Sequence, residues 1–212
     1  DAICDRVARK TGEEKRFVVM PAQALAQRRM TAEEFISWGG DGHPGKLELV
    51  NGMVRAISPA SGTHALLQST IAGLLRDHLR GRKSPCRVGT EAPIRPRMRS
   101  NENVRAPDVA VTCVPKSKDE KFFPDPILIV EVLSPSNQRE TWESIWACAT
   151  IPTLQEVMVV DSERINVAVY TKDATGAWPE HPKVVEGGGK VCLASIDAEF
   201  AVTDIYADTN LV

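Results

Sequence analysis

Aliphatic residues are concentrated in the short segment ILIVEVLSP at 127–135, where six of the first seven residues are Ile, Leu or Val. Pro126 and Pro135 bound this segment, and its length and composition predict a central strand that is buried on both faces. Glu131 is the exception within it. Because burying an unpaired carboxylate is costly, we expect the fold to give Glu131 a cation, a proton or a metal ion.

Three segments carry helical patterns. Thr31 and Glu34 form a capping-box pattern that begins a helix, and a glycine-rich stretch at 39–45 ends it. Ser61 or Thr63 can cap a second helix that runs to about residue 80, with aliphatic residues at helical spacing at 67, 71, 74, 75 and 79. A third helix is predicted from 138 to about 150, with Trp142, Ile145, Trp146 and Ala149 on one side.

Alternating apolar positions predict several strands. The dipeptide Asn51-Gly52 between two short alternating segments is a strong hairpin signal over 46–58. Within this hairpin, Leu47 and Leu49 share one face and Glu48 points to the other. Further strands are predicted near 86–95, 109–114, 156–160 and 165–170, followed by a meander.

This order of elements predicts an α/β (α+β) domain around a mixed central sheet flanked by helices. A chain of 212 residues fits a single domain with a sizeable core. We assign residues 30–212 to that domain. Residues 1–29 are expected to form an N-terminal appendage outside the main core.

Composition narrows the functional classes. The net charge of −2 and the pI near 6.1 provide no general attraction to polyanions, so a nucleic-acid site would require a local basic patch. No apolar run is long enough to span a bilayer. The five cysteines are scattered and odd in number, without a CxxC pair, which predicts reduced thiols and a cytoplasmic location.

Asp108 and Glu131 occupy consecutive predicted strands. The midpoint between them falls between residues 119 and 120, inside the connecting loop. If the two strands pair as a symmetric antiparallel hairpin, the two acids stand side by side at one end of the sheet. Because Mg²⁺ prefers carboxylate oxygens and water, this arrangement predicts a divalent-metal site.

Each of these residues also has a purely structural interpretation. Asp108 follows a proline at a strand start, where aspartate commonly caps or turns the chain. Glu48 could be solvated on its hairpin, and His64 could be a capping or surface residue in the first turn of its helix. Glu131 could form a buried ion pair with one of three arginines, at positions 95, 105 and 139.

The Pro-Asp at 107–108 and the later run VEVLSPS resemble the restriction-endonuclease-like PD-(D/E)xK superfamily. More narrowly, the chain resembles the Uma2 family of endonucleases over about residues 30–206. The matching segments are MTAEEFISW, LELVNGMVRAISPAS, APDVAV, ILIVEVLSPSN and IPTLQEVMVVD. The resemblance implies an αβββαβ core, binding of Mg²⁺ or Mn²⁺, and hydrolysis of phosphodiester bonds. It also implies an acidic set of Glu48, Asp108 and Glu131, with the Val132 carbonyl as a further metal ligand.

The chain departs from the superfamily pattern at the lysine. That residue normally stands two positions after the second acid, where this chain has Leu133. Related families place it on the following helix, at the position of Trp142. Arg139 or Gln138 could substitute, although arginine stays protonated and cannot act as a general base. Lys46 is a more distant option, and His64 could contribute acid–base chemistry.

Arginines alternate at 95, 97 and 99, so in an extended chain they share one face and could contact phosphates. Arg139 is a further candidate for nucleic-acid contact. The simpler interpretation of the alternating arginines is a solvated strand end.

Three functional hypotheses follow. The first is a metal-dependent DNA endonuclease; a homodimer is implied only by the resemblance, because similar nucleases are often dimers. The second is a catalytically degenerate nuclease fold that binds nucleic acid or a protein partner, which the missing lysine favours. The third is an unrelated domain in which Glu131 forms a structural ion pair.

Overall fold

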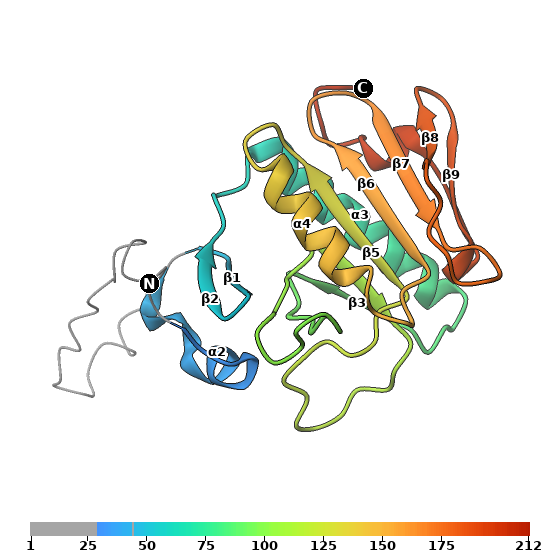
Figure 1. Cartoon of the computed structure of the whole chain (residues 1–212). Coiled ribbons are helices and arrows are strands. Elements are labelled where there is room, and N and C mark those ends of the chain that lie inside the picture. Colours follow the sequence, from blue (N-terminus) through green and yellow to red (C-terminus); the bar gives the residue numbers. More distant parts are fainter. Residues whose placement is uncertain (1–28, 44) are drawn as a thin grey trace, which may run out of the picture.

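The computed structural model describes residues 29–43 and 45–212 (Figure 1). The appendage expected at 1–29 therefore lies almost entirely outside the described residues. Within them, helix α3, strands β3, β4 and β5, helix α4 and strand β6 follow one another in sequence. The predicted αβββαβ core is confirmed.

Local sequence signals determine where the helices begin. Helix α2 (Ala32–Trp38) has the capping box that Thr31 and Glu34 predict. Helix α3 (Gly62–Gly81) begins after Ser61, whose hydroxyl accepts from the His64 backbone N–H. The other helical elements are α4 (Gln138–Cys148), α5 (Val202–Ile205), and the 3-10 helices η2 (Gly39–Gly42) and η3 (Ala194–Ile196).

A six-stranded sheet forms the centre of the fold, in the order β3-β4-β5-β6-β7-β8. Its strands are β3 (Arg87–Thr90), β4 (Val109–Thr112), β5 (Leu128–Leu133), β6 (Glu156–Asp161), β7 (Asn166–Thr171) and β8 (Lys183–Glu186). Only β5 and β6 pair in parallel, and the remaining neighbours are antiparallel. The sheet is mixed, as predicted.

Two hairpins accompany the sheet. Strands β1 (Leu47–Val50) and β2 (Met53–Ala56) form the hairpin predicted from Asn51-Gly52, and both turn residues have positive φ. Strands β9 (Lys190–Leu193) and β10 (Ala198–Ala201) form the second hairpin. Backbone bonds between Leu49 and Val104 tie the first hairpin to the segment that leads into β4.

Strand β5 is buried from Leu128 to Val132, as its aliphatic composition predicts. Successive side chains alternate between two cores on opposite faces of the sheet. Val130 and Val132 belong to the core that includes α3, whereas Ile129 packs in the core that includes Ile145 of α4. Figure 1 shows α4 and α3 on opposite sides of the sheet. The same alternation directs Glu131 toward the α4 side.

The four residues predicted to share one side of α4, Trp142, Ile145, Trp146 and Ala149, line one small pocket together, but this side is only partly buried. Ile145 is buried, but Trp146 is 55% exposed and stacks against Trp142. The buried side instead includes Thr141 and Ser144. Trp142 also packs edge-on against Tyr170 of β7.

The prediction that every cysteine is reduced is wrong for Cys86 and Cys113, which form a disulfide. These residues directly flank β3 and β4, whose register places them opposite each other. The pairing arises from strand register, so the wide spacing of the cysteines in sequence conceals it. Cys148 and Cys192 are free thiols. Among the described residues, no helix is both long and apolar enough to cross a membrane.

Candidate active site

Asp108 and Glu131 lie next to each other at the end of the β4–β5 pair. The observed register pairs Val109 with Val130 and Ala110 with Ile129, so the next position along brings Asp108 opposite Glu131. The backbone N–H of Asp108 donates to Glu131 Oε2 at 3.4 Å. Both residues are buried. The symmetric pairing inferred from the sequence is confirmed.

The Asp108 carboxylate is held from three directions. Its Oδ2 accepts from the Val132 backbone N–H at 2.8 Å and lies 3.2 Å from His64 Nε2. Its Oδ1 lies 3.3 Å from Lys46 Nζ. Burial works against ionisation, but the His64 hydrogen bond and the Lys46 charge prevail and lower the pKa of Asp108. Asp108 is therefore held as an anion.

Glu131 has a different environment. Its Oε1 accepts from the Ser144 hydroxyl at 3.3 Å, and no described arginine forms an ion pair with it. Burial, followed by the negative charge of Asp108, raises the pKa of Glu131 well above its usual range. Of the partners considered for a buried Glu131, the structural arginine pair is not found among the described residues. All three candidate arginines pair with other acids: Arg95 with Glu33, Arg105 with Glu48, and Arg139 with Glu140 and Glu143.

Lys46 is a candidate site residue that the sequence pattern underestimated. It begins the approach to β1, and its ammonium group reaches Asp108 across the site. Burial opposes its charge, but the nearby carboxylates of Glu131 and Asp108 outweigh that effect and raise its pKa. Lys46 is two positions before Glu48, so strand periodicity places both on one face, which is the signal that identifies it.

Glu48 is also buried, and both of its carboxylate oxygens have partners. Oε2 accepts from Arg105 at 3.2 Å, and Oε1 accepts from the Ala106 backbone N–H at 3.0 Å. Arg105 is itself only 3% exposed. The pair fixes the segment that leads directly into Asp108. The catalytic role predicted for Glu48 stays a prediction.

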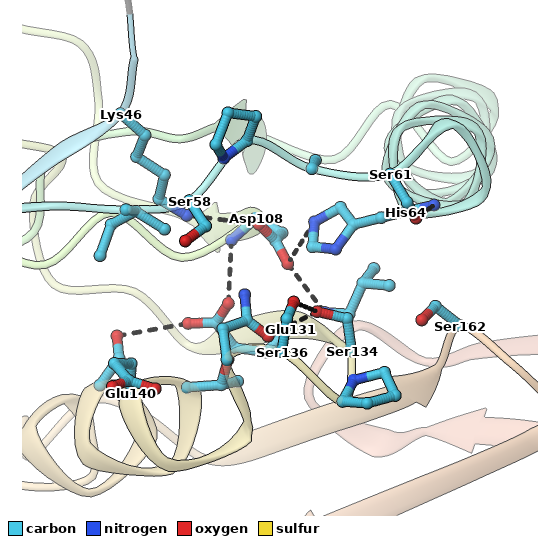
Figure 2. A pocket seen from close by; sticks show the side chains of 18 of the residues that line it. Lys46, Ser58, Ser61, His64, Asp108, Glu131, Ser134, Ser136, Glu140 and Ser162 are labelled. Atoms are coloured by element: carbon cyan, nitrogen blue, oxygen red, sulfur yellow. Dashed lines mark hydrogen bonds and ion pairs between the residues drawn. The ribbon is translucent and has the colours of Figure 1, made fainter.

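These residues line one cavity of about 750 Å³ (Figure 2). Its wall comes from the approach to β1, the loop before α3, the ends of β4 and β5, and the start of α4. Figure 2 shows Lys46 and His64 converging on Asp108 from different elements. Carboxyl groups in the lining outnumber ammonium groups: Glu48, Glu91, Asp108, Glu131, Glu140 and Glu163 against Lys46, with the His64 imidazole beside them.

The predicted phosphate-contacting arginines lie elsewhere. Arg95 pairs with Glu33 and stacks over Phe122, and Arg97 pairs with Asp125 at 3.0 Å. The expected extended chain does not persist, because Arg99 lies in a turn with a φ of 46°. Arg139 is highly exposed and lies near Glu143. None of the four appears in the lining of the cavity, as far as the described chain shows.

Asp108 and Glu131 are the candidate ligands for a divalent cation in this cavity. The described residues contain no group of three or more His, Cys, Asp or Glu side chains arranged to hold a metal. Two adjacent carboxylates, Asp108 and Glu131, nevertheless share one cavity, and the proximity of Asp108 disfavours ionisation of Glu131. This fits Mg²⁺, which is commonly bound by one or two carboxylates and several waters.

Comparisons with known proteins identify a family and a shared fold. The Uma2 family model, described as "Putative restriction endonuclease", matches residues 32–197. An uncharacterised protein of Synechocystis sp. is 29% identical over 180 residues, which covers 84% of this chain and 92% of that protein. The crystal structure of a "putative nuclease belonging to DUF820" from Anabaena variabilis superposes with a TM-score of 0.66 at 18% identity. That match covers 84% of this chain and 98% of the other, and it shows a shared fold.

Proposed function

Because the chain belongs to the Uma2 family, we propose that it is a metal-dependent DNA endonuclease that hydrolyses phosphodiester bonds. The observation that carries the proposal is the pairing of Asp108 with Glu131. Two buried acids on adjacent strands open into one cavity, and neither forms an ion pair with an arginine in the described chain. An arrangement that raises the pKa of a buried carboxyl group is typical of functional sites.

Asp108, Glu131 and the Val132 carbonyl would hold Mg²⁺ or Mn²⁺. The Val132 N–H faces Asp108, and the N–H and C=O of one strand residue point to the same edge, which supports the carbonyl as a ligand. When bound, the ion supplies Lewis-acid stabilisation of the phosphate and lowers the pKa of a water molecule.

Lys46 supplies the cation that Leu133 and Trp142 do not. Its raised pKa keeps it protonated, so it serves as a hydrogen-bond donor and positive charge for the phosphate oxygens, and not as a general base. Lys46 directly precedes β1, whereas the superfamily pattern places the lysine on the second acidic strand or the next helix.

His64 and Glu48 support the acids. His64 orients the Asp108 carboxylate through Nε2, and its second ring nitrogen is the atom through which acid–base chemistry would occur. Glu48 holds Arg105 and Ala106, so we assign it a positioning role beside its predicted catalytic one. Contact of Arg95, Arg97, Arg99 and Arg139 with DNA also stays a prediction.

The test is nicking of supercoiled plasmid DNA with Mg²⁺ or Mn²⁺. We expect cleavage by the wild type, and a loss of at least about a thousandfold in Asp108→Ala and Glu131→Ala, as for removal of a major electrostatic contributor. Glu199→Ala is the matched control, because that exposed acid pairs with Lys190 outside the cavity. Equal residual cleavage in the wild type and in both variants would exclude these acids as the site.

The degenerate nuclease is the second candidate, and the absence of lysine at Leu133 and Trp142 favours it. It predicts DNA binding without cleavage of plasmid, linear or branched substrates in either metal. A gel-shift assay alongside the nicking assay separates the two candidates.

Two further proposals concern the oligomeric state and the cellular location. A homodimer stays a prediction. A cytoplasmic location also stays a prediction, and the Cys86–Cys113 disulfide removes part of its support, since disulfides persist mainly in oxidising compartments.

A further inference from the structure

The loop between β5 and α4 lies at the end of the parallel pair of strands in the sheet. It follows the carboxyl end of β5, and β5 pairs in parallel with β6, the strand that α4 leads into. In sheets of this kind, ligands bind beyond the carboxyl ends of parallel strands, where helix N-termini favour anions. Residues 134–137 of this loop have the sequence Ser-Pro-Ser-Asn and line the cavity.

Helix α4 begins without a side-chain cap. The Asn137 side chain makes no capping hydrogen bond, whereas Thr31 caps α2 and Ser61 caps α3. The Asn137 Oδ1 atom accepts from the Ser134 hydroxyl instead. The first N–H groups of this eleven-residue helix are therefore available to an acceptor from outside the helix.

The hydroxyl groups of two largely buried residues provide independent evidence at the same place. Thr141 and Ser162 are each only 8% exposed, and both line the cavity. Neither hydroxyl has a hydrogen-bond partner among the described residues. Ser162 follows β6, and its backbone N–H donates to the Leu133 carbonyl, which places it beside the loop. Figure 2 shows the Ser162 hydroxyl directed toward Ser134.

We propose that this end of the cavity is a phosphoryl-binding subsite, formed by the start of α4 with the hydroxyls of Ser136, Thr141 and Ser162. The inference rests on the proposed nuclease function. It identifies the ligand as a phosphoryl group of the nucleic-acid strand, adjacent to the bond at Asp108 and Glu131. Hydroxyl and amide donors suit phosphate oxygens because each group places an N–H or O–H dipole toward the anion.

The affinity of this subsite for phosphate depends on the charges of the surrounding carboxylates. Glu140 and Glu163 line the same cavity and oppose an anion, and Glu131 adds to them when ionised. Arg139 lies 3.7 Å from Glu140 and offsets one of these charges in part. The subsite therefore binds phosphate best with a divalent cation present, which neutralises the carboxylates.

The experiment is an NMR titration of the ¹⁵N-labelled full chain in Mg²⁺, with inorganic phosphate and with dimethyl phosphate as separate probes. We expect the amide signals of residues 136–141 and 162 to shift. Ser162→Ala and Thr141→Val should each weaken binding roughly tenfold, the effect of losing one hydrogen bond to a charged group. Thermal melting curves of each variant serve as the control for correct folding.

Ser58→Ala is the matched control, since Ser58 lines the same cavity on the wall opposite α4, and its affinity should equal that of the wild type. Binding of both probes identifies an internal phosphodiester as the ligand, and binding of inorganic phosphate alone identifies a terminal phosphate. The subsite is refuted if Ser162→Ala and Thr141→Val bind as the wild type does, or if Ser58→Ala loses as much affinity. Because no cleavage is measured, a chain that cuts DNA but fails this titration retains the nuclease proposal and loses only the subsite.

Discussion

The backbone N–H of Asp108 donates to the carboxylate of Glu131, so the residue that supplies the first acid also holds the second. The Asp108 carboxylate in turn accepts from the Val132 N–H. Each acid is thus anchored to the backbone of the strand that carries the other. The β4–β5 register and these two hydrogen bonds hold the carboxyl groups close together, so their mutual repulsion persists in the folded state.

This repulsion makes stability depend on pH. Burial and the Asp108 charge raise the pKa of Glu131, so the folded state retains the Glu131 proton to a higher pH than the unfolded chain does. Its contribution to stability is full below the unfolded pKa and is lost as the pH rises through the folded pKa. Without metal, we expect Glu131→Gln to melt about 2–4 °C above the wild type at pH 8, the shift for roughly 1 kcal/mol.

The measurement is thermal unfolding by circular dichroism in EDTA at pH 5 and pH 8. The advantage of Glu131→Gln should be larger at pH 8. Glu163→Gln, at the more exposed rim of the same cavity, should change the melting temperature little at either pH. A constant difference between the wild type and Glu131→Gln at both pH values would contradict a raised pKa.

Lys46 should matter for catalysis more than for folding. Lys46→Met removes the ammonium group beside Asp108, and we expect cleavage to fall about a hundredfold to a thousandfold. Lys46→Arg retains the charge with different geometry and should be intermediate. Single-turnover nicking rates give the comparison, with exposed Lys118→Met as the control. Wild-type rates in Lys46→Met would remove this residue from the mechanism.

Removing only one partner of the buried Glu48–Arg105 pair should destabilise the fold more than removing both charges. Arg105→Met leaves the Glu48 carboxylate buried without its cation, and we expect a loss of about 3–5 kcal/mol in unfolding free energy. Glu48→Gln combined with Arg105→Met removes both charges and keeps an acceptor for the Ala106 N–H. In urea denaturation, the double variant should have a higher unfolding free energy than Arg105→Met alone. A lower unfolding free energy in the double variant would show that another group stabilises the charge of Glu48.

The disulfide should stabilise the β3–β4 pair. Cys86 and Cys113 are 27 residues apart, and closing a loop of that length contributes about 3–4 kcal/mol in the chain-entropy model. Guanidinium unfolding without reductant should show that loss in Cys113→Ser, and the wild type in dithiothreitol should match the variant. Cys192→Ser, at an exposed free thiol, should unfold like the wild type. A wild type indifferent to dithiothreitol would contradict the bond.

Much of the fold follows from local signals. The Asn51-Gly52 turn, the capping box at Thr31 and the buried strand around Glu131 are each encoded within a few residues, because turn chemistry, helix capping and side-chain periodicity are short-range effects. The register of Asp108 with Glu131 also follows from the sequence, since the loop between their strands is symmetric about its midpoint.

Tertiary structure decided the partners of those residues. Lys46 approaches Asp108 across 62 positions, Arg105 pairs with Glu48 rather than with Glu131, and Cys86 meets Cys113 across two strands. The sequence by itself determined which side chains are ionisable and which strand face each one occupies. It could not determine which opposite charges meet, because that depends on how the hairpin, the sheet and the helices pack against one another over long separations in the chain.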